Sequence, residues 1–263
     1  MRKNKLFNSM VVIIGSLLVG THVFAATGHA PLQKVENNLC DQASLQRGAK
    51  LYVNYCQGCH SLEHARYKSV AADIGIKTPE GEVLEALVQT NLNFVSDKVT
   101  SPIKSAMPKK DAGEWFGVAP PDLTLTARVR GKNWVYTYLK SFYKDETRPW
   151  GVNNLVFPDV GMPHVLHELQ GTQIPRFEKI RLKAEDGTTS EHKVVDKLEL
   201  ASPGAMSETE YDRAITDLVN FLDYVGEPHK LERQRIGVWV ILFLIIFTLF
   251  AYLLKREYWK DVH

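Results

Sequence analysis

The chain carries the stretch YVNYCQGCHSL at residues 52–62, and this stretch decides what kind of domain surrounds it. Cys56, Cys59 and His60 form a Cys-x-x-Cys-His motif, which is the attachment signature of c-type haem. The two thiols bond covalently to the vinyl groups of the porphyrin, and the histidine binds one face of the iron. The motif therefore predicts one covalent haem c, held by Cys56, Cys59 and His60.

Two other kinds of paired-cysteine site are disfavoured by the sequence. A zinc site would need two further ligands, and Cys40 is the one other cysteine, so a four-cysteine cluster cannot form. A thioredoxin-like redox pair sits in a βαβ background, which this largely helical sequence lacks. Cys40 itself is expected to be a small, buried, free thiol, with a disulfide to another chain as the alternative.

Residues 1–25 have the three-part layout of a secretory signal peptide. Arg2, Lys3 and Lys5 precede an apolar run that is too short to cross a bilayer, and small residues follow it. We expect cleavage after Ala25 or Ala26, with an uncleaved anchor as the alternative.

Residues 236–254 read IGVWVILFLIIFTLFAYLL and contain no charged side chain. A helix of this length covers about 28 Å, close to the hydrocarbon thickness of a membrane. Trp239 lies near one end, and Tyr252, Tyr258 and Trp259 lie near the other, as interfacial aromatics do. The sequence predicts a transmembrane helix, with residues 26–235 exported and residues 255–263 left in the cytoplasm.

Charge and composition restrict the remaining choices. The formal net charge of +2 becomes slightly negative once the signal peptide is removed, because three of the 32 bases leave and all 30 acids stay. Nothing in this balance suggests a nucleic-acid partner. The 44% of hydrophobic residues suffices for a buried core.

The exported part is predicted to be mainly α. One helix begins at Asp41 and leads into the haem motif, one follows Thr78-Pro79, one follows Gly131, and one runs from a capping box at Ser207 and Glu210 to Gly226 and Pro228. On the third helix we expect a shared face of Trp134, Tyr138 and Phe142.

Two segments between the helices differ from this pattern. Residues 176–196 alternate and turn at Asp186-Gly187, which predicts a small β-hairpin. Residues 148–175 are rich in Pro, Gly and Asn and show no period, so we expect a long functional loop. The predicted fold class is mainly α with long loops, a small β-hairpin and one C-terminal transmembrane helix.

The second face of the haem iron needs a ligand of its own. Met107 and Met162 both lie in loops, whereas Met206 precedes a helix cap and is expected to pack. Apolar residues surround Met162, and two lysines follow Met107, so burial favours Met162 and leaves Met107 as the alternative. His164 and His167 are nearby competitors that we expect to form a solvent-exposed or hydrogen-bonded surface pair.

Five blocks of the chain, taken in order, resemble the cytochrome c1 family, the haem c subunit of the bc1 complex. They are RGAKLYVNYCQGCHSL, WFGVAPPDLTLTARVRG, NNLVFPDVGMPHVL, the capped helix ending YVGEP, and the single C-terminal anchor. The resemblance covers almost the whole mature chain, and the signal peptide and short tail look like the bacterial form. It implies a cytochrome c-like haem domain.

The resemblance also implies roles for particular residues. The axial methionine of the family lies in a Gly-Met segment that matches Gly161-Met162. The APPDL block, with Pro120 and Pro121, lines the haem pocket, and either Arg128 or Arg130 pairs with a haem propionate. We prefer Arg130. Trp134 falls where other members have a haem-contacting tyrosine, so a role that depends on that hydroxyl is not expected at this position.

The implied function is electron transfer. The chain would accept an electron from the Rieske iron-sulfur protein and pass it to a soluble or membrane-bound cytochrome c, beside cytochrome b in the bacterial inner membrane, with its haem domain in the periplasm. It would belong to an oxidoreductase complex without catalytic residues of its own. Three alternatives remain: a membrane-anchored monohaem cytochrome serving a terminal oxidase or periplasmic reductase, a haem enzyme or gas sensor with an open iron site, and a purely structural membrane subunit.

Overall fold

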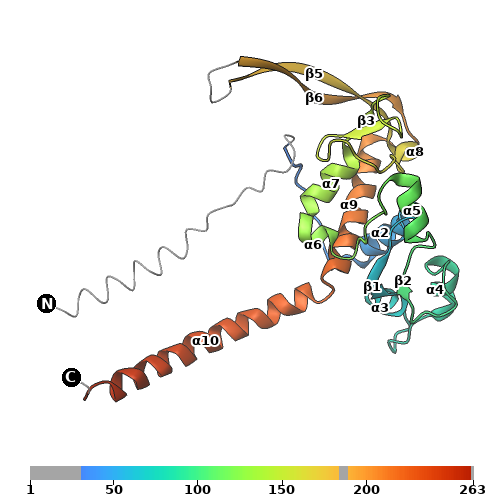
Figure 1. Cartoon of the computed structure of the whole chain (residues 1–263). Helices are drawn as coiled ribbons and strands as arrows, with labels where there is room; N and C mark the ends of the chain where they lie inside the picture. Colours follow the sequence, from blue (N-terminus) through green and yellow to red (C-terminus); the bar gives the residue numbers. More distant parts are fainter. Residues whose placement is uncertain (1–30, 184–188, 262–263) are drawn as a thin grey trace.

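The computed structural model describes residues 31–183 and 189–261 of the chain. The predicted signal peptide and the predicted turn at Asp186-Gly187 lie outside this range. The described part consists of a mainly helical body, a long β-hairpin and a long C-terminal helix (Figure 1). The predicted fold class is confirmed.

The described elements follow one another in chain order, and their strands form three separate two-stranded antiparallel sheets, β1-β2, β3-β4 and β5-β6. The elements are α2 Gln42–Tyr55, β1 Leu62–Arg66, α3 Tyr67–Asp73, α4 Glu85–Asn91, β2 Pro102–Ile103, α5 Lys109–Phe116, α6 Thr126–Arg130, α7 Lys132–Lys140, β3 Phe142–Lys144, β4 Val152–Asn154, α8 His167–Gln170, β5 Gly171–Lys183, β6 Thr189–Pro203, α9 Glu208–Gly226 and α10 Lys230–Tyr258.

The core of the body lies where α2 crosses α9. Both helices begin at the predicted caps: Asp41 accepts a hydrogen bond from the Ser44 amide, and Ser207 and Glu210 form a reciprocal capping box. The backbones approach closely at Gly48, because a Cβ atom built there would lie 2.1 Å from the Asp217 carbonyl oxygen. Glycine is therefore required for this helix contact.

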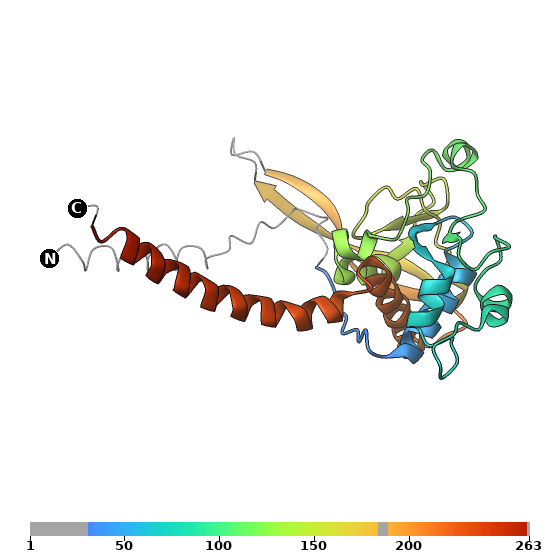
Figure 2. The same cartoon turned by 90° about the horizontal axis from the view of Figure 1, so that it is seen from below.

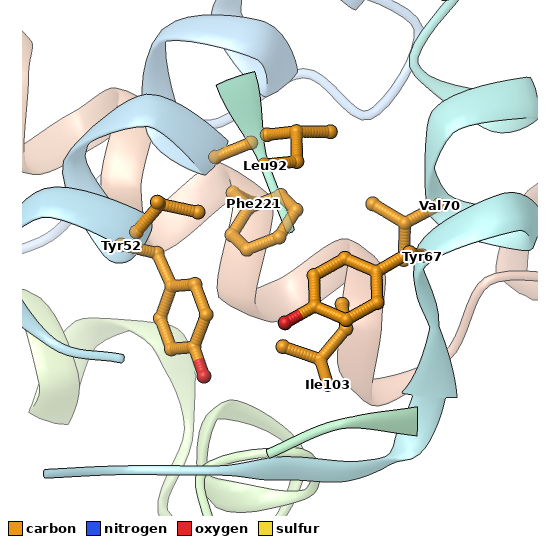
Figure 3. A pocket seen from close by; sticks show the side chains of 8 residues that line it. Tyr52, Tyr67, Val70, Leu92, Ile103 and Phe221 are labelled. Atoms are coloured by element: carbon orange, nitrogen blue, oxygen red, sulfur yellow. The ribbon is translucent and has the colours of Figure 1, made fainter. Parts of the chain in front are cut away.

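Side chains from α2, α3 and α9 pack tightly around this crossing. Tyr52 lies against Phe221 with ring centroids 5.8 Å apart, and Tyr67 faces them from α3 (Figure 3). The void that these residues line holds only about 10 Å³, and its walls are mostly apolar. It is a packing defect rather than a ligand site.

The helix predicted after Thr78-Pro79 begins later than expected. Residues 78–82 form a turn in which the Thr78 amide donates to the Glu82 carbonyl and Gly81 has a φ of 93°. Because Gly81 takes the left-handed conformation here, the chain cannot continue as a helix, and α4 starts at Glu85.

Four other predictions need correction. Phe142 lies in β3, just beyond the end of α7. The hairpin is longer than predicted, and the stretch 148–175 contains β4, α8 and the start of β5. Cys40 is free, as expected, but exposed instead of buried.

The helix α10 is longer than the predicted span because it begins six residues before Ile236 and continues to Tyr258. By length and composition it can cross a membrane, and none of its most apolar window is buried in the body. In both views it leaves the body on the same side as the β5-β6 hairpin (Figures 1 and 2).

Candidate haem site

The C-terminal end of α2 delivers the Cys-x-x-Cys-His motif in a tight turn. The amides of Cys59 and His60 both donate to the Cys56 carbonyl, at 3.1 and 2.8 Å. The Tyr52 hydroxyl donates to the His60 carbonyl at 2.7 Å. Tyr52 belongs to α2 and its ring is buried against Phe221 of α9, so the packing of the two helices also holds the haem motif in place.

Both motif thiols are unpaired and protonated. Burial raises the pKa of Cys56 to about 12 and also raises the pKa of Cys59. Within residues 31–183 and 189–261 no group of three or more His, Cys, Asp or Glu side chains could hold a metal ion. A zinc site built on these cysteines therefore has no further ligands in the described chain.

The ring of His60 is held by one hydrogen bond. Its Nδ1 lies 2.8 Å from the carbonyl oxygen of Pro121. Burial lowers the pKa of His60, so the imidazole is neutral and Nδ1 carries the hydrogen. The Nε2 lone pair is then available for a metal, with the ring orientation fixed from behind as in many metal-binding histidines. His60 thus fits an axial haem ligand.

The segment after Pro121 is pinned to the segment after His60. The Leu123 amide donates to the Ser61 carbonyl at 2.9 Å, and the Glu63 amide donates to the Asp122 carboxylate at 2.7 Å. Sequence reasoning missed Asp122, whose only signal was an acid directly after two prolines. Through these bonds the APPDL block is fixed against the haem motif.

A cavity of about 390 Å³ opens beside Cys59. Pro120 and Asp122 border it, so this cavity adjoins the APPDL block as well as a thiol of the motif. Met107 lines the same cavity with lysines nearby, and its amide donates to the Ser105 hydroxyl at 3.0 Å.

The loop that carries Met162 reaches the same region from the other direction. A Cβ atom built on Gly161 would lie 3.7 Å from the Phe116 carbonyl oxygen and 3.9 Å from the Val118 side chain. Val118 lies three residues before Pro121, which holds His60. The structure therefore brings the Gly161-Met162 segment next to the segment that orients the histidine.

Two buried asparagines brace this loop. The Asn154 side chain donates to the Tyr138 carbonyl at 2.8 Å and accepts from the Val156 amide at 3.0 Å. The Asn153 side chain accepts from the Asp159 amide at 2.8 Å. Sequence analysis assigned them no role, although two adjacent asparagines in an aperiodic stretch were a signal for such bracing.

The helix α7 presents aromatic side chains toward this loop. Trp134 and Tyr138 stack with ring centroids 5.0 Å apart, and Phe157 meets Trp134 edge-on at 6.5 Å. The Tyr138 hydroxyl lies 3.3 Å from the sulfur of Met162. Burial raises the pKa of Tyr138, so this hydroxyl keeps its hydrogen. A hydroxyl that Trp134 lacks is thus present at Tyr138, one helical turn further on.

The two candidate arginines have different partners. Arg128 lies 3.6 Å from the carboxylate of Glu227, next to the end of α9. The guanidinium of Arg130 lies over the ring of Trp134, 5.0 Å from its centroid, and forms no ion pair within the described residues. Arg130 therefore has a positive charge without an acidic partner among the described residues, and this charge lies next to the aromatic side chains of α7.

The histidines after Met162 form the expected hydrogen-bonded pair, because Nδ1 of His167 lies 3.1 Å from the carbonyl oxygen of His164. His164 is half-buried and stacks on Phe142 with centroids 4.8 Å apart, whereas His167 is exposed. Burial lowers the pKa of His164 to about 4, so it is neutral at physiological pH. Contact with Phe142 explains why His164 is the more buried of the two histidines.

Comparison with known proteins gives the chain its family. The Cytochrome C1 family model matches residues 34–172 and 202–262. The chain belongs to the cytochrome c1 family. Cytochrome c1 of Allochromatium vinosum is 50% identical over 94% of this chain and 96% of that protein. The ammonia monooxygenase gamma subunit of Nitrosomonas europaea is 41% identical over the same shares, and cytochrome c1 of Rhodospirillum rubrum is 27% identical over 84% and 83%.

Cytochrome c1 proteins are electron-transfer subunits of bc1 complexes and carry one covalently bound haem c. The chain is accordingly an electron carrier within an oxidoreductase complex, and the predicted cofactor is confirmed. The apolar C-terminal helix and the bacterial cytochromes c1 together indicate that it is anchored in a membrane.

The family match leaves out residues 173–201, which form most of the β5-β6 hairpin. The hairpin therefore lies mostly outside the matched segments, and we expect that the haem site does not need it. Its base contacts the body: the Gln173 side chain donates to the carbonyls of Lys140 and Phe142, both at 2.8 Å.

Shortening the hairpin tests this independence. Pro175 pairs with Leu198, so an Asn-Gly turn can join them and replace residues 176–197 while keeping Gln173. We expect haem content and midpoint potential, measured by haem absorbance and redox titration, to equal those of the wild type. A fall in either would show that the hairpin supports the site.

Proposed function

We propose that Cys56 and Cys59 hold the haem c through two thioethers and that His60 and Met162 bind its iron. When bound, haem c supplies a one-electron couple, and a methionine ligand raises its potential above that of a bis-histidine site. A raised potential suits a carrier that receives electrons from a Rieske centre. Two contacts support this most: His60 is hydrogen-bonded to Pro121, and Gly161, next to Met162, lies against Phe116 and Val118 just before the same APPDL block.

The residues around these ligands have separate tasks. The Pro121 carbonyl orients the His60 ring and keeps its hydrogen on Nδ1. The brace by Asn153 and Asn154 holds the Met162 loop against α7. Pro120 borders the cavity beside Cys59 and would cover part of a haem bound there. Exclusion of water by such contacts favours a high potential.

We assign the propionate contact to Arg130. Its charge is not neutralised within the described chain, and its stacking on Trp134 directs it to the aromatic side of the site. Arg128 is better placed to stabilise the end of α9, because Glu227 is its neighbour. A buried or half-buried propionate next to an arginine is a charge-assisted contact, which is among the stronger hydrogen bonds in proteins.

The proposed partners follow from membership of the bc1 complex. The electron would come from the Rieske iron-sulfur protein and leave to a soluble or membrane-bound cytochrome c, with cytochrome b as the neighbour in the bilayer. Residues 236–254 would span the bacterial inner membrane, residues 26–235 would lie in the periplasm after removal of residues 1–25, and residues 255–263 would remain in the cytoplasm.

Purification from membranes tests the proposed partners. In mild detergent the protein should be isolated together with b haems and a Rieske cluster, detected by optical and electron paramagnetic resonance spectra. Isolation with a terminal oxidase or a periplasmic reductase, and without b haems, would instead support a monohaem cytochrome that serves those enzymes.

Substitution of the cysteines tests the attachment. In Cys59→Ala, with one thioether left, we expect the haemochrome absorption band to shift to longer wavelength, and the double variant with Cys56→Ala should retain no covalent haem. Cys40→Ala is the matched control, because Cys40 is exposed and lies before α2. Covalent haem in the double variant would rule out the assignment.

A further inference from the structure

The Tyr138 hydroxyl makes one hydrogen bond within the described residues, to the sulfur of Met162 at 3.3 Å. We propose that Tyr138 is a positioning residue of the haem site: its hydrogen bond holds the Met162 sulfur toward the iron and raises the potential of the haem. This inference rests on the proposed function, because it takes Met162 as the axial ligand. Neither the haem motif nor the family blocks quoted from the sequence point to Tyr138.

The position of the hydroxyl is fixed by the packing of its ring. Trp134 stacks on one face of the ring at an interplanar angle of 10°, and Phe142 meets it at 5.1 Å and 71°. A ring held between two aromatic neighbours cannot change rotamer without displacing them. The hydroxyl therefore points at Met162 without requiring a loss of side-chain entropy when the ligand binds.

The backbone of Tyr138 is tied to the same loop as its side chain. Its carbonyl oxygen accepts from the Asn154 side chain at 2.8 Å, and Asn154 is fully buried. Asn154 in turn accepts from the amides of Val156 and Phe157, at 3.0 and 3.2 Å. The helix that carries the donor and the loop that carries the sulfur are thus joined by hydrogen bonds through Asn154.

The chemistry of the thioether explains the expected direction. A methionine sulfur has two lone pairs, so it can bind iron with one and accept a weak hydrogen bond with the other. A donor at the second lone pair withdraws electron density from the sulfur. The sulfur then stabilises ferric iron less, and the reduced state is favoured. Loss of the hydroxyl should reverse this effect and lower the potential.

The test compares Tyr138→Phe with wild type in the full-length holoprotein. Phenylalanine keeps the ring and its packing and removes only the hydroxyl. We expect the equilibrium constant for reduction to fall about two- to tenfold, the range that one modest hydrogen bond provides. We also expect the far-red absorption band of methionine-ligated ferric haem to persist and to move in wavelength.

Tyr136→Phe is the matched control. Tyr136 is buried on the same helix, but its hydroxyl accepts from the Lys140 ammonium at 3.2 Å and has no contact with Met162. We expect its potential and its far-red band to equal those of the wild type.

Failure of this inference can be told apart from failure of the proposed ligand. If Met162→Leu lowers the potential and Tyr138→Phe leaves both potential and band unchanged, the hydrogen bond has no role and the ligand assignment stands. If Met162→Leu retains the far-red band and the potential, Met162 is not the ligand and both proposals fall. A rise in potential in Tyr138→Phe would also overturn the inference.

Discussion

Replacing Met162 by leucine should lower the midpoint potential of the haem strongly and open one face of the iron. Leucine has a similar volume but no sulfur, so the fold should tolerate it while the second axial ligand is lost. Axial ligands set haem potentials over a range of about 0.8 V, and we expect the reduction equilibrium to fall by far more than about tenfold. Redox titration measures this change, and carbon monoxide binding to the reduced protein measures the open site.

Met107→Leu is the control for this experiment. Met107 borders the cavity beside Cys59 together with Lys104 and Lys109, and its amide donates to the Ser105 hydroxyl. We expect its potential to match that of the wild type, with no carbon monoxide binding. If the two variants exchanged behaviour, Met107 would be the ligand. If the wild type itself bound carbon monoxide readily, a haem enzyme or gas sensor would be the better description.

Replacing Gly48 by alanine should produce the largest loss of stability in the body. The added Cβ atom would lie 2.1 Å from the Asp217 carbonyl oxygen and 2.7 Å from Cβ of Phe221, so α2 and α9 must separate. Overpacking of a core costs about 1–3 kcal/mol, and a clash with backbone falls at the upper end of that range or beyond it. Because α2 ends in the haem motif, haem incorporation should fall as well.

Gly113→Ala provides the comparison within another helix. Gly113 lies inside α5, and a Cβ atom there would meet nothing closer than the Ala119 amide nitrogen at 4.0 Å. We expect a small gain in stability from the better helix propensity of alanine. The measurements are the thermal unfolding midpoint and the haem content of the detergent-solubilised protein. A Gly48→Ala variant as stable as wild type would show that the helices can part freely.

Local chemistry explains why much of the site could be predicted from the sequence. The haem motif spans five residues, and the caps at Asp41 and Ser207 are formed by neighbours three positions away, so each pattern contains most of its own structural information. The apolar C-terminal segment needs no tertiary partner to be recognised as a helix. The resemblance then pointed to Met162 over Met107, which the burial pattern alone had only favoured.

Features that depend on distant parts of the chain were missed or wrong. The Thr78-Pro79 pair looks like a helix start, but Gly81 turns the chain before any helix begins. The partial burial of His164 was not predicted, because its ring stacks on Phe142, which belongs to another element of the chain. The Asp122 carboxylate accepts from the amide of Glu63, 59 positions earlier in the chain. The local spacing of residue types gives no signal for a contact between such distant positions.

The link between α9 and α10 has a consequence for the geometry of electron transfer. Only residues 227–229 separate the two helices, and Lys230 reaches back to the Asp223 carboxylate at 3.0 Å, while Glu227 pairs with Arg128 and with Arg233. Since α9 also packs against α2, which ends in the haem motif, we expect the haem site and the proposed membrane helix to keep a fixed spacing. If the proposed partners are right, a change in the separation between the haem and its electron donor would then require movement of the donor.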